Sequence, residues 1–207
     1  MQLETLPTFC DSSAIQFSGT LNEDGLLSGT IHIIKKGNQA GELLSAKGMN
    51  PRERMLYAFD MLTSFYPLAE LDSFDLDLSK PEMVSMDIHF HRDFGQQKNM
   101  IILPLPVEYT NVPQMERDNP IHISQTTFSS VNLNIAIPED FTVVEIPENS
   151  SHKGNNFSYS STYDLSQSTL SASSQALLIR GFIDNENEYR DMQLLRSREI
   201  RLVVKEK

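Results

Sequence analysis

The amino-acid sequence predicts a mainly β chain, an antiparallel β-sandwich architecture with one or two short helices. Residues 131–137 alternate apolar with small or polar side chains, residues 141–146 are rich in apolar ones, and a proline ends each run. Similar runs recur at short spacing along most of the chain. Helical spacing is confined to short stretches, so an α/β fold is not indicated.

A β-hairpin is expected near the start of the chain. Residues 14–21 predict one strand and residues 26–36 the returning strand. Residues 22–25 predict the turn between them, because Gly25 can adopt a positive φ. Residues 1–13 are predicted to be an N-terminal tail or linker.

Residues 50–66 predict an α-helix. Asn50 can cap it, Pro51 suits the first helical position, and Glu53 stands at the capping-box position. Pro67 ends the run. Apolar residues follow one another at helical spacing, and we expect this face to pack into the core: Met55, Leu56, Phe59, Leu62 and Tyr66.

The remaining segments predict mainly strands. Residues 111–120 form a polar, proline-bearing connection, which we interpret as an internal boundary. Residues 14–110 would then be a β-rich subdomain with one helix, and residues 121–207 a C-terminal β-sandwich-like subdomain, although the two could pack as one domain. A short helix is predicted near residues 186–196. Further strands are predicted at residues 74–78, 86–90, 100–105, 157–163, 165–182 and 199–205.

The composition sets limits on the class of protein. The chain has 207 residues, of which 39% are hydrophobic and 22% charged, as in ordinary soluble globular proteins. Its net charge of -11 argues against binding of nucleic acid or of an anionic membrane surface. No run of about 18 apolar residues occurs, so membrane insertion is not expected. Residues 1–7 lack the basic and apolar regions of a signal peptide, which leaves the compartment open.

One group of side chains could bind a metal ion. Asp87, His89 and His91 would project from the same face of a strand, because they are spaced two apart. Two such imidazoles could share a zinc ion, with the carboxylate completing or orienting the set, as in a small metal-dependent enzyme. The favoured interpretation is the solvent face of an amphipathic strand, because Ile88 and Phe90 supply its buried face. No cofactor is expected.

Other catalytic patterns are weak or missing. Cys10 is the only cysteine, which excludes an intramolecular disulfide, and the adjacent Asp11 disfavours its thiolate. The acidic residues between 70 and 77 do not have the spacing of a calcium-binding loop, so they predict a solvated strand face. No phosphate-binding loop or serine-hydrolase elbow occurs in the sequence. No catalytic residue is therefore predicted.

Residues 157–163 interleave aromatic residues with serine and threonine. Phe157, Tyr159 and Tyr163 would share one side of a strand. A tyrosine ring has a flat apolar face and a polar tip, so this ribbon could contact carbohydrate or protein. Ordinary cross-strand packing is the favoured interpretation.

The strand and proline pattern resembles the C-terminal β-rich module, a domain of unknown function, of bacterial multidomain transglutaminase-like proteins. The similarity extends from about residue 14 to residue 205 and includes segments 21–29, 103–106 and 116–120. Its main motifs are Leu133-x-Ile135-x-Ile137-Pro138-x-x-Phe141-x-Val143-x-x-Ile146-Pro147, the Phe157-Ser158-Tyr159 strand, Tyr189 in a helix, and Ile200-x-Leu202-Val203-Val204-x-Lys205.

The resemblance implies a noncatalytic accessory or interaction module rather than an enzyme. In that family the catalytic Cys, His and Asp belong to a central domain, and no residue of this chain matches them. The resemblance implies a periplasmic or cell-envelope protein of a bacterium, with a transglutaminase-like domain in the same or another chain, or another protein, as partner. From a different class, the alternative is a carbohydrate- or cell-wall-binding module that uses the ribbon at residues 157–163.

Overall fold

The computed structural model describes residues 11–94, 101–104, 120–139, 141–166, 168–183 and 199–204. Cys10 and the helix predicted near residues 186–196 lie outside these ranges. In chain order the elements are β1 (Asp11–Leu21), β2 (Leu26–Lys36), the 3₁₀ turn η1 (Gly37–Gln39), α1 (Ala40–Leu44), the 3₁₀ turn η2 (Ser45–Gly48), α2 (Pro51–Phe65), β3 (Glu70–Lys80), β4 (Met83–Asp93), β5 (Ile101–Pro104), β6 (Ile121–Ile123), β7 (Thr127–Ala136), β8 (Phe141–Glu145), β9 (Ser150–Lys153), β10 (Phe157–Ser166), β11 (Thr169–Leu178), β12 (Gly181–Ile183) and β13 (Glu199–Val204).

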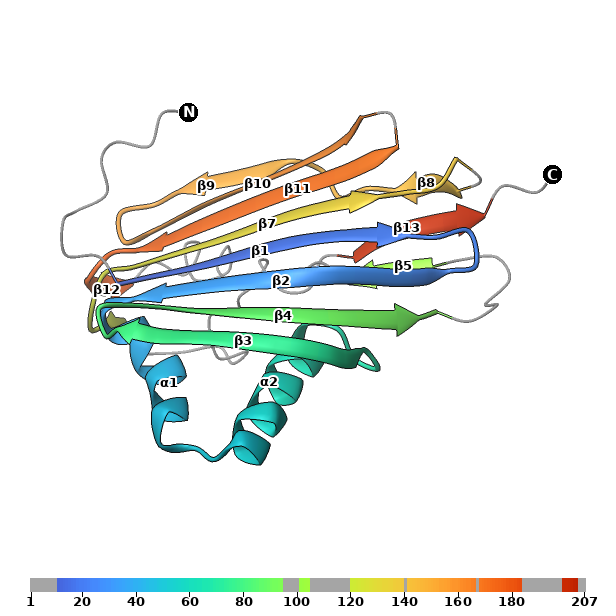
Figure 1. Cartoon of the computed structure of the whole chain (residues 1–207). Coiled ribbons are helices and arrows are strands. Elements are labelled where there is room, and N and C mark those ends of the chain that lie inside the picture. Colours follow the sequence, from blue (N-terminus) through green and yellow to red (C-terminus); the bar gives the residue numbers. More distant parts are fainter. Residues whose placement is uncertain are drawn as a thin grey trace.

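One eight-stranded sheet dominates the molecule (Figure 1). Its strand order is β3-β4-β2-β1-β7-β11-β10-β9. Neighbouring strands are antiparallel except β1 and β7, which run parallel with Ile15 opposite Val131 and Phe17 opposite Leu133. This pair joins a strand of one predicted subdomain to a strand of the other. The division into two subdomains stays a prediction.

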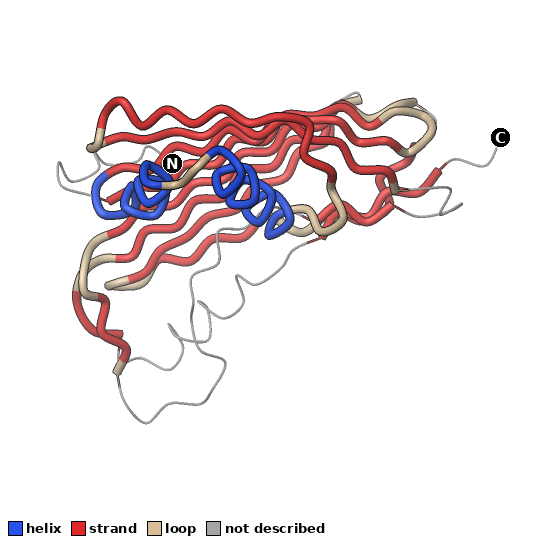
Figure 2. Tube along the Cα trace, turned by 60° about the horizontal axis from the view of Figure 1, so that its bottom comes forward, coloured by secondary structure: helices blue, strands red, loops and turns tan. Residues whose placement is uncertain are grey.

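Two small sheets, β12–β6 and β5–β13–β8, accompany the large one (Figure 2). Phe141 of β8 belongs to the main hydrophobic core, and Ile123 of β6 packs with Phe157 of β10. The prediction of a mainly β chain with short helices is confirmed. The sandwich is not confirmed, because the two other sheets among the described residues have only two and three strands and the large sheet is mixed rather than antiparallel.

The main core lies on one face of the large sheet, here called the inner face. At its centre the rings of Phe17, Tyr66 and Phe90 lie 5.1 to 5.6 Å apart between centroids. Gly19 and Gly29 lie opposite each other beside Phe17. A Cβ atom on either glycine would come within 3.2 Å of the Phe17 ring, so the glycine pair makes room for that ring.

Helix α2 begins as the sequence predicts. The Asn50 side chain accepts hydrogen bonds from the backbone N–H groups of Arg52 and Glu53, both at 3.0 Å. Glu53 Oε2 in turn accepts one from the Asn50 N–H at 2.8 Å, which completes the capping box. The helix is tied to the preceding turn by Arg54, whose guanidinium donates to the Ala46 and Lys47 carbonyls.

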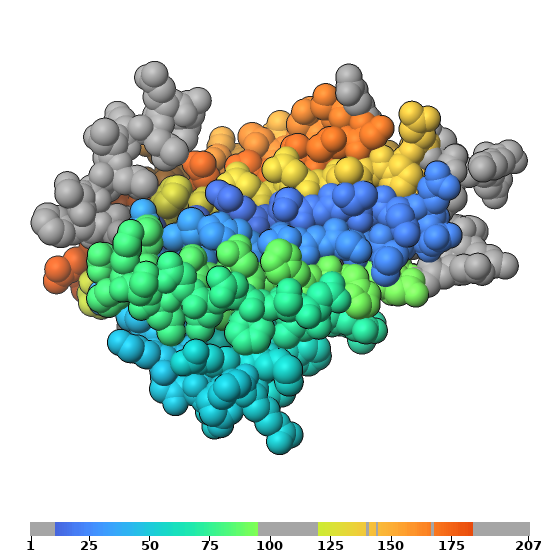
Figure 3. Space-filling model, in the orientation of Figure 1, coloured from blue at the N-terminus to red at the C-terminus, as the bar shows by residue number. Residues whose placement is uncertain are grey.

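The prediction of which α2 side chains enter the core is partly wrong. Leu62 and Tyr66 are buried as expected, and Ala58 joins them. Met55 and Leu56, however, are each 48% exposed, and Phe59 is 42% exposed. The physical reason is that α1 and α2 stand out beside β3 as a helical projection (Figures 1 and 3), so only one side of α2 reaches other parts of the chain.

Candidate functional site

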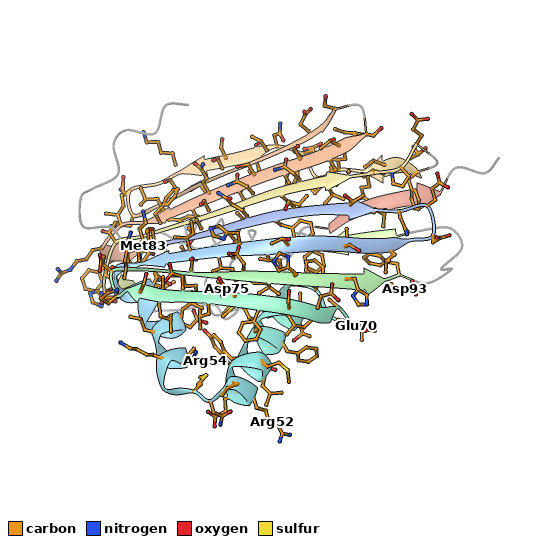
Figure 4. The ribbon with its side chains drawn as sticks, in the orientation of Figure 1. Arg52, Arg54, Glu70, Asp75, Met83 and Asp93 are labelled. Atoms are coloured by element: carbon orange, nitrogen blue, oxygen red, sulfur yellow. The ribbon has the colours of Figure 1, made fainter. Side chains whose placement is uncertain are left out.

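The group proposed as metal ligands lies on the outer face of β4, opposite the core. Ile88 and Phe90 point into the core, so Asp87, His89 and His91 point away from it. In Figure 4, Glu70, Asp75 and Asp93 mark the edge of the sheet to which this group belongs. The shared face therefore follows the alternation read from the sequence.

Each member of this group bonds to a different cross-strand partner. His32 Nδ1 lies 2.6 Å from Asp87 Oδ1, and His89 Nδ1 lies 3.0 Å from Thr30 Oγ1. His91 Nδ1 lies 2.7 Å from Asp72 Oδ1, and its Nε2 lies 3.5 Å from Glu70 Oε2. Within the described ranges, no three His, Cys, Asp or Glu side chains come together as a metal site.

These cross-strand partners could not be predicted from the sequence. His32 and Thr30 come from β2, and their neighbours on β4 are fixed by the pairing register of the two strands. That register depends on how β4 enters between β2 and β3, which alternation along one strand does not reveal. Paired in this way, the imidazoles and carboxylates form a polar hydrogen-bonded surface rather than a convergent ligand set.

The outer face continues as a field of small polar side chains across β1, β2, β7 and β11. It includes an open depression of about 450 Å³ where β1 and β7 end and β2 and β11 begin. Ser171 Oγ donates to Asn134 Oδ1 at 2.9 Å beside it. The polar and small side chains that line the depression are Ser18, Thr20, Ser28, Asn134, Ala136 and Thr169.

The aromatic ribbon of β10 lies on the inner face. Phe157 is fully buried against Ile123 and Ile183, so its ring belongs to the core and is not available as a contact surface. Tyr159 packs beside it at 5.7 Å between ring centroids, and Tyr163 is partly buried against the main core. A glycan or protein at the outer face would meet Ser158, Ser160 and Thr162 of this strand rather than its rings.

The largest departure from sequence expectations is the apolar surface of α2. Met55, Leu56 and Phe59 lie on the outward side of the helix, each more than two-fifths exposed. The inward side is held by the Arg54 bonds to η2 and by Tyr57, whose hydroxyl donates to the Glu42 carbonyl at 3.3 Å. Burial and the neighbouring Glu42 raise the pKa of Tyr57 to about 12.

A further exposed apolar residue, Leu68, follows the helix. Leu68 is 84% exposed and has a φ of 69°, which is rare for a bulky side chain. It occupies the third position of a turn in which the Ala69 N–H donates to the Tyr66 carbonyl at 3.1 Å, with Pro67 second. Residues held in such sparsely populated backbone conformations cluster at functional sites.

The fold and these surfaces define a β-rich protein with a polar outer sheet face and an exposed apolar helix. Residues 98–199 match the model of a family described as a domain of unknown function with solved structure, DUF3858. The match covers just under half of the chain and supports the expectation of a domain of unknown function. No curated protein and no solved structure matches the chain. The association with transglutaminase-like proteins stays a prediction.

The matched segment begins after β4, so α1 and α2 lie outside it. Among the helices that the structure describes, none has the length and apolar character needed to cross a membrane.

Proposed function

We propose that this chain is a noncatalytic module that mediates protein contacts, with a transglutaminase-like domain as its partner, in the same polypeptide or in a separate one. The observation that carries the proposal is the exposed apolar side of α2. In the free chain the exposed surface of Met55, Leu56 and Phe59 contributes no hydrophobic stabilisation. A partner that covered it would gain about 1 kcal/mol of binding free energy from each side chain.

Two further observations support a contact role over a catalytic one. The histidines and carboxylates of the outer face are engaged with partners on neighbouring strands, which favours a structural surface. The Leu68 side chain lies in solvent although its backbone φ is strained. A partner that covered this side chain would bury its apolar surface. The choice of a transglutaminase-like partner rests on the resemblance alone.

The proposal is tested by titrating the chain into a purified transglutaminase-like domain from the same organism, with calorimetric detection. A complex is expected, and Leu56→Asp should weaken it at least about tenfold because a charge would enter an apolar contact. Gln16→Asp, which introduces the same charged residue on the exposed outer face of β1, is the control and should bind like the parent chain.

Two results would contradict the proposal. One is the lack of any complex at the highest soluble concentrations. The other is hydrolase or acyl-transfer turnover by the chain itself that disappears in His89→Ala, His91→Ala or Cys10→Ala, because a noncatalytic module has no turnover to lose.

A further inference from the structure

The outward side of α2 carries charges in a symmetric arrangement around its apolar centre. Arg52 stands four residues before Leu56, and Asp60 stands four residues after it. With a rise of about 1.5 Å per residue, each charge lies about 6 Å along the helix from Leu56, in opposite directions. Both charged residues are exposed, and Arg52 lies at the end of α2 that projects from the molecule (Figure 4).

Neither charge is used within the described part of the chain. Among the described residues, no side chain forms an ion pair with the Arg52 guanidinium or the Asp60 carboxylate. The nearby Glu53 carboxylate is already engaged as acceptor of the Asn50 N–H. Arg54, the next cation along the helix, is turned inward to η2. Arg52 and Asp60 are therefore available to a molecule that covers the apolar centre.

A helix with this arrangement is complementary to itself. When two copies cross antiparallel around a two-fold axis near Leu56, the early turns of one helix face the late turns of the other. Arg52 of each copy then comes opposite Asp60 of the other, and the apolar side chains meet between the two ion pairs. A parallel arrangement would instead place like charges together.

We propose that a second copy of this chain covers the outward side of α2, in an antiparallel helix pair with two symmetric Arg52–Asp60 ion pairs. This inference rests on the α2 contact surface named in the proposed function and assigns its occupant in the isolated chain. The area offered by one helix face is small, so the dimer is weak and reversible, with a dissociation constant of about 10 to 100 μM.

Sedimentation velocity over a range of concentrations measures the association. In about 0.15 M salt, where the Debye length is about 8 Å, the repulsion between two copies of net charge -11 is screened while direct contacts persist. The average mass should rise from 23.5 kDa toward twice that value as the concentration increases. Leu56→Asp should remain monomeric over the same range.

Charge reversal tests the geometry. Arg52→Asp and Asp60→Arg should each weaken self-association about tenfold, because each variant places like charges opposite each other twice. The equimolar mixture of the two single variants should form a heterodimer, since its charges are again complementary, and the double variant should regain the homodimer. Lys153→Asp and Asp24→Arg are matched control reversals at exposed positions away from α2 and should leave association within about twofold.

The exposed positions make these variants compatible with folding, which circular dichroism checks. A chain that is monomeric at all concentrations overturns the inference, and so does a dimer that the single reversals leave unchanged or that the mixture fails to restore. If the chain is monomeric while Leu56→Asp still loses the transglutaminase-like domain, the second copy is rejected and the proposed function stands. If the dimer forms but the transglutaminase-like domain does not bind, the proposed function is rejected and the second copy stands as the occupant.

Discussion

At the scale of single residues, several side chains lie in environments that could not be predicted from the sequence. Leu68 is the clearest, because its φ of 69° belongs to the region that favours glycine. Nothing in the Tyr66–Ala69 sequence marks the position apart from Pro67, which is typical of the preceding turn position. The strain is therefore a property of how α2 must end to enter β3.

Leu68→Gly should raise the free energy of unfolding by about 1 kcal/mol, since glycine adopts this φ without steric conflict. Urea unfolding measures the change. Leu68→Ala is the control, because it removes the exposed side chain but keeps a Cβ atom in the same strained backbone. Equal stability of the two variants would show that the turn is not strained.

Gly29→Ala should lower the free energy of unfolding by about 1 to 3 kcal/mol. Its new Cβ would lie 2.7 Å from the Ser18 carbonyl oxygen and 3.2 Å from the Phe17 ring, so backbone or ring must shift. Gly41→Ala serves as the matched control: that Cβ meets nothing within 4 Å in helix α1, so a gain of up to about 1 kcal/mol is expected. A harmless Gly29→Ala would contradict the packing described for Phe17.

Tyr66 should make the protein less stable in alkali. Burial raises the pKa of its hydroxyl far above the ordinary value of 10.0, so the folded chain keeps the proton while the unfolded chain loses it. The stabilising contribution is present below pH 10 and falls as the pH rises above it. Urea unfolding at increasing pH should show this fall, with a shallower slope in Tyr66→Phe. An unchanged slope would contradict the assignment.

At the scale of elements, α2 shows what periodicity can and cannot predict. Asn50, Pro51 and Glu53 fixed the start of the helix correctly, because capping depends on local sequence. The spacing of the apolar residues predicted a helix correctly. It could not show which of them are buried, because they lie on more than one side of the helix. Which side is buried is decided by the angle at which α2 leaves the sheet, and that angle depends on α1, η2 and β3.

Leu62→Ala should therefore lower the free energy of unfolding by about 2 to 5 kcal/mol, because Leu62 is fully buried. Leu56→Ala changes the same kind of side chain in the same helix but at a half-exposed position, and it should cost less than about 1 kcal/mol. Guanidinium unfolding of both variants at low protein concentration measures the difference. Similar losses would mean that Leu56 is part of the core after all.

At the scale of the whole molecule, strands were predictable and their assembly was not. Alternation located β1, β2, β4, β7 and β10, because each buries one face. The parallel pairing of β1 with β7 joins residues more than a hundred positions apart, so no turn sequence between them could predict it. Individual strand patterns likewise could not reveal that small sheets and helices, rather than a second continuous sheet, pack on the described core.

The same limit applies to the candidate site. The outer-face position of His89 and His91 followed from alternation, whereas their partners required the sheet register. The aromatic ribbon was correctly placed on one side of β10, yet the sequence could not tell that this side is the inner one. The α2 surface was missed because the spacing that predicts a helix also predicts, by default, that its apolar residues are covered.

The central claim is that another protein surface covers the outward side of α2. The chain contains no tryptophan, so Phe59→Trp would place a single indole reporter there. Its emission should shift to the blue as the chain concentration rises or when the transglutaminase-like domain is added. The control Phe182→Trp, at a 62% exposed position on β12, should not shift. Emission from position 59 that stays at the solvent-exposed wavelength under both conditions would contradict the claim.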